Sequence, residues 1–164
     1  MPNSKRKVRR RIIVRHSAIH GKGVFAACRI RKGTRVIEYK GKLITEDAAD
    51  EKYGDDEGTH TFLLLLDNNM VIDANHNGNS ARWMNHSCDP NCETCEEDGR
   101  VFVDAIRNIK PGEELTYDYK LIVDEPYTAK LKRLYACGCG KAKCRGTILG
   151  RRRPSQTNKR AAAK

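Results

Sequence analysis

The sequence predicts a mainly β protein, a β-rich α+β fold in which several small sheets form one domain. Three observations predict this class. Apolar and β-branched residues occur in short runs, and Gly, Asn, Asp and Pro separate these runs at a spacing that fits small sheets better than a βαβ array. The length of 164 residues suits one compact domain. The expected strands are residues 12–14, 23–26, 35–39, 61–66, 70–72, 101–105 and 115–117.

Turn-forming residues mark the ends of several of these strands. Lys32-Gly33 and Asn68-Asn69 are turn pairs, because Gly and Asn tolerate the left-handed backbone that tight turns require. Lys110-Pro111-Gly112 predicts a third turn, in which proline presets the backbone angle before the glycine.

Two helices are expected beside the strands. Thr45 is a suitable N-cap, and Glu46 and Asp47 follow it in the first turn, where negative charge interacts favourably with the helix dipole. Thr128 is a second suitable cap, shortly before a group of cysteines. The expected helices cover residues 45–53 and 128–135.

The distribution of apolar residues gives no indication of a membrane protein. The longest strongly apolar run, residues 62–66, is far shorter than the ~20 residues of a membrane-spanning helix. The basic N-terminus is not followed by an apolar segment, so we expect no secretory signal. We therefore expect an intracellular protein, without membrane contact, in a reducing compartment.

The formal net charge of +11 comes from the two ends of the chain. Residues 1–11 and 150–164 together carry twelve of the 32 basic residues and none of the 21 acidic ones, so the part between them is nearly neutral. We expect basic disordered tails at residues 1–10 and 150–164. Two interpretations stay open for them: solvated tails that favour solubility, or tails that contact the phosphates of a nucleic acid.

Acidic residues cluster in two segments of the central part. Residues 46–57 and 93–98 are rich in Asp and Glu. Acidic patches would raise the local concentration of a basic peptide. The equally simple alternative is a solvated helix face and an acidic loop.

Three cysteines near the C-terminus have the spacing of metal ligands. Cys137, Cys139 and Cys144 lie in a segment rich in Gly and Lys that buries little apolar surface, which favours a structural zinc ion. Structural zinc takes four ligands, so the fourth must come from elsewhere. An alternative is a second metal site at Cys88, Cys92 and Cys95. Disulfides are disfavoured, because the number of cysteines, seven, is odd and no signal peptide is apparent.

Five segments carry distinctive combinations of residues, in a fixed order along the chain. They are Gly21-Lys22-Gly23, Tyr39-Lys40-Gly41, Arg82-Trp83-Met84-Asn85-His86-Ser87-Cys88-Asp89-Pro90-Asn91-Cys92, Glu114-Leu115-Thr116-Tyr117-Asp118-Tyr119, and the cysteine triplet.

This ordered set resembles the motifs of SET-domain protein-lysine methyltransferases, especially the trithorax and mixed-lineage-leukaemia type. The resemblance covers about residues 11–149 and implies a SET domain at 11–125 followed by a zinc-binding post-SET segment at 126–149. It also implies a β-clip fold with a C-terminal pseudoknot, in which one motif segment is threaded under a loop formed by the other. No cysteine-rich pre-SET region precedes the motifs here, a layout that also resembles stand-alone SET proteins from outside eukaryotic chromatin.

The resemblance further implies two bound groups, S-adenosyl-L-methionine and a structural zinc ion. Cys88 would be the fourth zinc ligand, beside Cys137, Cys139 and Cys144. A tyrosine that contacts the cofactor is common in the strand near Phe62, where this sequence offers His60 and Phe62 instead. The residues expected to bind the cofactor are His20, Gly21, Lys22, Gly23, Phe62, Arg82, Asn85, His86 and Gly138.

Three tyrosines match the catalytic positions of the family. Tyr119 would orient the substrate amine and stabilise the transferring methyl group, and Tyr39 would form a wall of the lysine channel. Tyr117 occupies a position where family members carry either Phe or Tyr. Its hydroxyl would crowd out bulkier methylated forms, so a mono- or dimethyl product is expected. The alternative for any of the three is ordinary core packing with a satisfied hydroxyl.

The leading hypothesis is methylation of lysine in basic proteins, with a histone or a histone-like protein as substrate. The protein would then lie in the nucleus or on chromatin, and otherwise in the cytoplasm. The basic tails are additional candidate methyl acceptors. The alternative from another class is a zinc-stabilised chromatin or nucleic-acid binding module whose catalytic site has decayed. The sequence predicts no oligomeric state.

Overall fold

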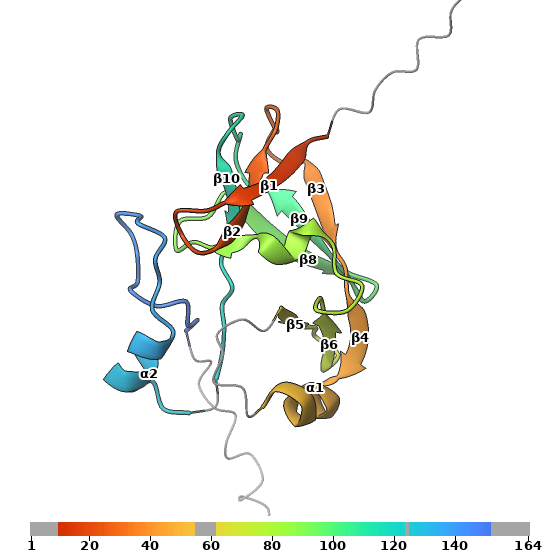
Figure 1. The fold of residues 1–164 in the computed structure, drawn as a ribbon, viewed down its shortest axis with the longest axis vertical. Helices are drawn as coiled ribbons and strands as arrows, with labels where there is room; N and C mark the ends of the chain where they lie inside the picture. The colour runs from red at the N-terminus through yellow and green to blue at the C-terminus, as the bar shows by residue number, and fades with distance from the viewer. Residues whose placement is uncertain (1–9, 55–61, 124, 152–164) are drawn as a thin grey trace, which may run out of the picture.

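The computed structural model describes residues 10–54, 62–123 and 125–151. The described residues form three small β-sheets with two short α-helices and one 3₁₀ turn (Figure 1), which confirms the predicted mainly β class. The two predicted basic tails lie almost entirely outside the described residues, as do His60 and Thr61. Among the described helices, none is long and apolar enough to cross a membrane.

The first sheet brings together two motif segments that lie far apart in the sequence. Its strand order is β1-β2-β10-β7, and β7 and β10 are parallel, with Asn85 opposite Thr116 and His86 opposite Tyr117. The backbone of Ser87 extends this pairing by donating to the carbonyl of Tyr117 at 3.2 Å. The expected threading of one segment under a loop stays a prediction. The strands are β1 (Ile12–His16), β2 (Lys22–Ala26), β7 (Asn85–His86) and β10 (Glu114–Tyr117).

The other two sheets have three strands each. One has the order β3-β9-β8 and the other β4-β6-β5, and all their pairings are antiparallel. The strands of the former are β3 (Arg35–Tyr39), β8 (Cys92–Glu97) and β9 (Arg100–Ala105); those of the latter are β4 (Lys42–Thr45), β5 (Leu63–Leu65) and β6 (Met70–Asp73).

Both predicted helices are present, and both begin at the predicted cap. The hydroxyl of Thr45 accepts a hydrogen bond from the backbone of Ala48, and that of Thr128 accepts one from Leu131. These bonds satisfy backbone donors that the first turn leaves unpaired. The helices are α1 (Glu46–Tyr53) and α2 (Ala129–Leu134), and the 3₁₀ turn is η1 (Ser80–Trp83).

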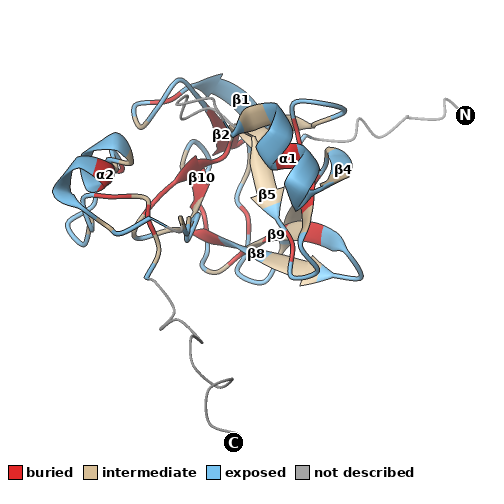
Figure 2. Ribbon diagram, turned by 90° about the horizontal axis from the view of Figure 1, so that it is seen from below, coloured by how far each residue is buried: buried red, intermediate tan, exposed pale blue. Residues whose placement is uncertain are grey.

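The core lies between the sheets. Val24, Met84, Ile109 and Leu115 are at most 1% exposed and belong to one cluster, and a second cluster surrounds Tyr39. Figure 2 shows this division: buried segments run through β2 and β10, whereas α2 is mostly exposed. The strands beside the candidate site are therefore held by apolar burial.

The structure also corrects the strand prediction. Strands β4, β7 and β8 were missed, and residues 93–98 form β8 and a tight turn rather than an acidic loop. Asp98 and Gly99 both have positive φ, +50° and +70°, which is the geometry of a two-residue hairpin turn. The predicted turns are confirmed by positive φ at Gly33, Asn69 and Gly112.

Candidate active site

A cavity of about 500 Å³ lies where the loop before β2, strand β7 and the C-terminal segment meet. This volume is within the range of about 300–1,000 Å³ that is typical of small-molecule sites. Its lining includes nine of the residues predicted to bind the cofactor or to act in catalysis. These are His20, Gly21, Lys22, Phe62, Arg82, Asn85, His86, Tyr119 and Gly138.

Asn85 fixes the loop that forms one wall of this cavity. Its side-chain amide donates to the carbonyls of His20 at 3.2 Å and Lys22 at 2.9 Å, and to the carboxylate of Glu114 at 2.8 Å. Glu114 also accepts from the hydroxyl of Ser17 at 2.8 Å. Asn85 is therefore a structural tie as well as a lining residue.

The glycines expected at the cofactor site have different physical roles. Gly21 has φ +45°, a conformation that favours glycine. A Cβ on Gly138 would lie 3.2 Å from the carbonyl of Ile19 on the opposite wall. Gly23 is not among the lining residues; a Cβ there would collide with the carboxylate of Glu114. Gly23 thus permits close packing behind the wall.

His86 connects the cavity to the cysteines. Its Nδ1 accepts a hydrogen bond from the backbone N–H of Tyr119 at 3.1 Å, so the ring proton lies on Nε2, which is 3.3 Å from Cys88 Sγ. Burial lowers the pKa of His86 to about 4, so the imidazole is neutral near pH 7. A neutral ring of this tautomer donates to Cys88 and accepts from Tyr119.

The three predicted catalytic tyrosines lie near one another. The ring centroids of Tyr117 and Tyr119 are 5.0 Å apart, and the hydroxyl of Tyr119 donates to the carbonyl of Met84 at 2.7 Å. Burial raises the pKa of Tyr39, Tyr117 and Tyr119, and the neighbouring Tyr39 raises the latter two further. All three phenols are therefore neutral near pH 7.

Two cations and two aromatic rings form a further part of the lining. Lys22 Nζ lies 4.6 Å from the ring centroid of Trp83, and the guanidinium of Arg82 lies 4.6 Å from the same ring. Phe62 packs edge-on against Trp83 at 4.9 Å. Such cation–π contacts hold the positive groups in place at the cavity.

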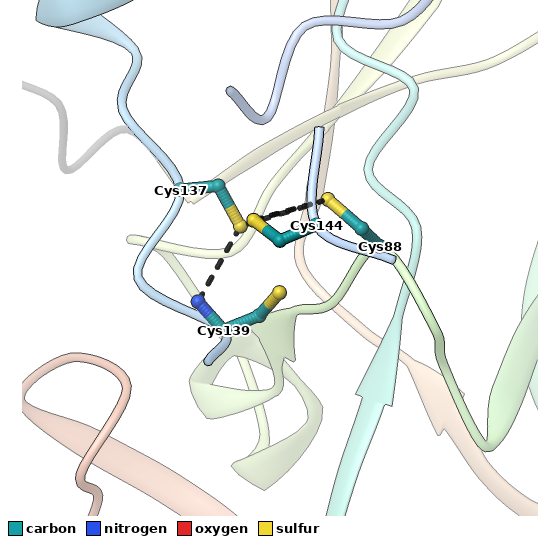
Figure 3. A group of neighbouring side chains, drawn as sticks. All are labelled: Cys88, Cys137, Cys139 and Cys144. Carbon is teal, nitrogen blue, oxygen red and sulfur yellow. Dashed lines mark hydrogen bonds between the residues drawn. The ribbon is translucent and has the colours of Figure 1, made fainter. Parts of the chain in front are cut away.

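The sulfur atoms of four cysteines converge beside this cavity (Figure 3). Those of Cys88, Cys137, Cys139 and Cys144 all lie within 4.8 Å of one another. The Cys88 sulfur is 3.7 Å from that of Cys137 and 3.9 Å from that of Cys144. Tetrahedral zinc with Zn–S of about 2.3 Å requires sulfurs ~3.8 Å apart, so this donor set fits the metal.

Backbone donors surround the same sulfurs. The N–H groups of Arg145, Cys139 and Gly146 point to the sulfurs of Cys88, Cys137 and Cys144 at 3.3 to 3.4 Å. Hydrogen bonds of this kind favour the thiolate form that zinc requires.

Comparison with known proteins agrees with this geometry. Residues 21–120 match the SET domain. The chain belongs to the SET-domain family. This SET domain is 39% identical over 135 residues to histone-lysine N-methyltransferase trithorax of Drosophila virilis, covering 79% of this chain and 3% of that protein. It is 41% identical over 138 residues to human histone-lysine N-methyltransferase 2B, covering 80% of this chain and 5% of that protein.

Two further matches are a plant protein and a solved structure. Histone H3-lysine(4) N-trimethyltransferase ATX1 of Arabidopsis thaliana is 36% identical over 85% of this chain and 13% of its own length. The structure of ctPRC2 in an autoinhibited conformation bound to S-adenosylmethionine aligns with a TM-score of 0.60 and 34% identity, over 67% of this chain and 15% of that one. This SET domain thus spans only a small part of each relative.

The alternative metal site of the sequence analysis is not formed. Cys92 is fully buried in the core, while Cys95 lies three residues further along β8, on the other face of the strand. Among the described residues, the group at Cys88 is the one with metal-ligand geometry.

Sequence reasoning missed part of the lining of this SET-domain cavity. Trp83 lies inside a recognised motif and could have been included. Leu134 ends α2 just before the cysteines, and it is a half-exposed apolar residue that lines the cavity. The missed residues are Ile19, Trp83, Leu134, Tyr135, Ala136 and Ile148.

Proposed function

We propose that this SET domain transfers a methyl group from S-adenosylmethionine to the side chain of lysine in a basic protein, a histone or a histone-like protein. The observation that carries this proposal is a single cavity in which Asn85, His86 and the loop before β2 meet Tyr119. The relatives named as histone-lysine methyltransferases support the same activity.

The lining of the cavity suits S-adenosylmethionine. Ile19, Leu134 and Ile148 offer apolar surface to a purine ring, and Lys22 and Arg82 offer positive charge to a carboxylate. We assign Asn85, His86, Phe62, Gly21 and Gly138 to the same binding site, with Gly23 as a packing residue behind it. When bound, the cofactor supplies a methyl group activated by its sulfonium.

The substrate amine must first lose a proton. Deprotonating a lysine of pKa ~10.4 at pH 7 costs about 4–5 kcal/mol, and a desolvated channel lowers that cost because it disfavours the ammonium. Tyr39, Tyr117 and Tyr119 would form such a channel, and as neutral phenols they give the ammonium no ion-pair partner. The proton lost by the ammonium would pass to solvent. The neutral amine would then form the new N–C bond as the S–C bond breaks, so that the positive charge moves from sulfur to the methylated ammonium and the cofactor leaves as a neutral thioether.

Tyr119 would align this displacement. Its hydroxyl hydrogen is held by the carbonyl of Met84 at 2.7 Å, so the oxygen lone pairs are left for the amine and for the polarised methyl group. Alignment of this kind supplies several kcal/mol of rate acceleration.

Zinc held by Cys88, Cys137, Cys139 and Cys144 would close the cavity. Cys88 lies two residues after β7. The other three ligands lie in the C-terminal segment that forms the opposite wall of the cavity. The metal would thus staple that wall to the sheet.

Tyr117 is proposed to limit the product to mono- or dimethyllysine, because its hydroxyl occupies space near the amine. Tyr117→Phe should shift the product towards a higher methylation state in mass spectrometry. Strong trimethylation by the unchanged protein would contradict this assignment. The plant relative is named as a trimethyltransferase, so both outcomes have a counterpart among the possible products.

A basic substrate agrees with the charge of one described element, helix α1. The exposed side of α1 carries Glu46, Asp47, Asp50 and Glu51, which would attract a positively charged peptide. With a histone as substrate, the protein acts on chromatin in the nucleus. The basic tails are proposed as nucleic-acid contacts and as secondary methyl acceptors.

The experiment that tests this function is methyl transfer from labelled S-adenosylmethionine to purified histones and basic bacterial proteins, followed by mapping of the modified lysine. Tyr119→Phe is the matched control and should reduce the rate about 10²–10³-fold. If no protein is labelled and calorimetry detects no cofactor binding, a zinc-stabilised binding module becomes the better account.

A further inference from the structure

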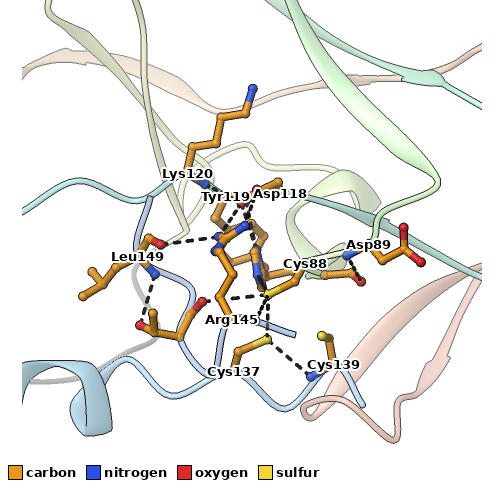
Figure 4. A network of polar contacts seen from close by, with 12 residues as sticks. Cys88, Asp89, Asp118, Tyr119, Lys120, Cys137, Cys139, Arg145 and Leu149 are labelled. Atoms are coloured by element: carbon orange, nitrogen blue, oxygen red, sulfur yellow. Dashed lines mark hydrogen bonds and ion pairs between the residues drawn. The ribbon is translucent and has the colours of Figure 1, made fainter. Parts of the chain in front are cut away.

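Arg145 directly follows Cys144, and its side chain reaches Asp118, the residue before Tyr119. The guanidinium forms a two-point ion pair with Asp118: Nη1 lies 2.7 Å from Oδ2, and Nη2 lies 3.0 Å from Oδ1 (Figure 4). Nη2 also donates to the carbonyl of Leu149 at 3.4 Å. Two parallel bonds fix orientation as well as distance, which a single lysine contact does not.

Asp118 in turn bridges the backbone across Tyr119. It directly precedes Tyr119, and its Oδ1 accepts a hydrogen bond from the N–H of Lys120 at 3.0 Å. Lys120 has φ +48°, a left-handed conformation that is unfavourable for a residue with a side chain. The carboxylate therefore helps to stabilise an unfavourable turn directly after the tyrosine.

Arg145 also touches the sulfur cluster through its main chain. Its N–H lies 3.3 Å from Cys88 Sγ, so one residue contacts the metal ligands with its backbone and the turn of Tyr119 with its side chain. The ion pair is partly shielded, with side chains 33% and 22% exposed. A short series of contacts, through Arg145 and Asp118, thus joins the cysteine-rich segment to Tyr119.

We propose that Arg145 is a positioning residue, which aligns Tyr119 for methyl transfer by locking Asp118 when the cysteine-rich segment is folded. The catalytic part of this inference rests on the proposed function. The locking itself concerns the backbone of residues 118–120 and is measurable without any reaction.

The matched variants separate positioning from general stability. Arg145→Gln removes the ion pair, Arg145→Lys keeps the charge but not the two-point geometry, and Asp118→Asn keeps an acceptor for Lys120. Arg35→Gln is the control, because Arg35 forms a similar two-point pair with Glu97, at 2.9 and 2.7 Å, and neither residue adjoins one assigned to the site.

Arg145→Gln should lower kcat about tenfold to a hundredfold, since small misplacements of aligned groups have effects of this size. Zinc content and the cofactor Kd should stay within about threefold of the unchanged protein, because neither the sulfur ligands nor the cavity lining is altered. Arg145→Lys should recover part of the rate. Asp118→Asn combined with Arg145→Gln should be no worse than Arg145→Gln alone. Arg35→Gln should match the unchanged protein.

Hydrogen exchange supplies the second readout. The Tyr119 amide, bonded to His86, should exchange about tenfold faster in Arg145→Gln, as expected when a local tie is lost, whereas amides of β2 should not change. The proposal is overturned if kcat and the exchange rate of Arg145→Gln equal those of Arg35→Gln, or if kcat falls only in proportion to lost zinc. If the unchanged protein transfers no methyl group, the proposed function fails, and the exchange rate alone decides whether Arg145 locks the turn.

Discussion

The two walls of the cavity are stabilised by different kinds of interaction. Asn85 and His86 lie on a strand of the first sheet, 8% and 4% exposed, and neighbouring strands bury Val24 and Leu115 completely. The opposite wall, from α2 to residue 148, includes Leu134 at 50% exposure. Apolar burial holds the first wall, whereas the second is joined to it by the ion pair of Arg145 with Asp118 and, in the function proposed above, by zinc on four cysteine sulfurs. The walls should therefore respond to different perturbations.

The largest effect on stability is expected in the first wall. Leu115→Ala removes a fully buried side chain from the main core cluster, so the free energy of unfolding should fall by about 2–5 kcal/mol. Urea denaturation measures this change. Zinc content at low temperature should stay unchanged; its loss in this variant would mean that the two walls are not independent.

A smaller effect is expected from the carboxylate of Asp73, which is 1% exposed on its side chain. Burial alone would raise its pKa, but hydrogen bonds from Tyr53, Asn75 and His76 outweigh it and lower the pKa to about 2. Because the folded pKa lies below the usual 3.8, this stabilisation is present above about pH 5 and is lost as the pH falls towards 2.

The measurement for Asp73 compares the unchanged protein with Asp73→Asn in urea at several pH values. The difference in unfolding free energy should shrink by about 2 kcal/mol between pH 6 and pH 2, since one pKa unit corresponds to about 1.4 kcal/mol. Asp50→Asn on the exposed side of α1 is the control. A difference that does not vary with pH would mean that the ionised carboxylate of Asp73 does not stabilise the contact between α1 and β6.

The smallest effect is expected in the second wall. Leu134→Ala should change stability by less than about 0.5 kcal/mol, because the side chain is half exposed. The cofactor Kd should rise about fivefold, or about 1 kcal/mol, from lost apolar contact. Leu65→Ala, 57% exposed on β5, should alter neither quantity. An unchanged Kd for Leu134→Ala would exclude this wall from cofactor contact.

Local signals in the sequence were sufficient for much of the fold. The hydroxyls of Thr45 and Thr128 cap helices where expected, since capping depends on residues three positions away. The strand at residues 92–97 was missed although Asp98-Gly99 is a typical hairpin signal. Its acidic residues suggested a loop, but Glu93, Glu96 and Glu97 remain at least partly exposed to water in this strand.

The site was harder to predict, because its parts meet only through tertiary structure. The spacing of Cys137, Cys139 and Cys144 indicates a metal without any knowledge of the fold. The fourth sulfur, from Cys88, is far away in sequence and was expected from family resemblance alone. Ile148 and Leu134 have no local signal for a cavity, since only the folding back of the C-terminal segment brings them there.

The central claim is that one metal site closes the cavity in which methyl transfer takes place. Cys88→Ser tests it most directly when zinc content, cofactor Kd and methyl transfer are measured on the same sample, with Cys95→Ser as the control. We expect Cys88→Ser to lose most of its zinc, to weaken cofactor binding more than about tenfold and to lose methyl transfer, because structural zinc contributes folding free energy directly. Full zinc content together with full activity in Cys88→Ser would contradict the account.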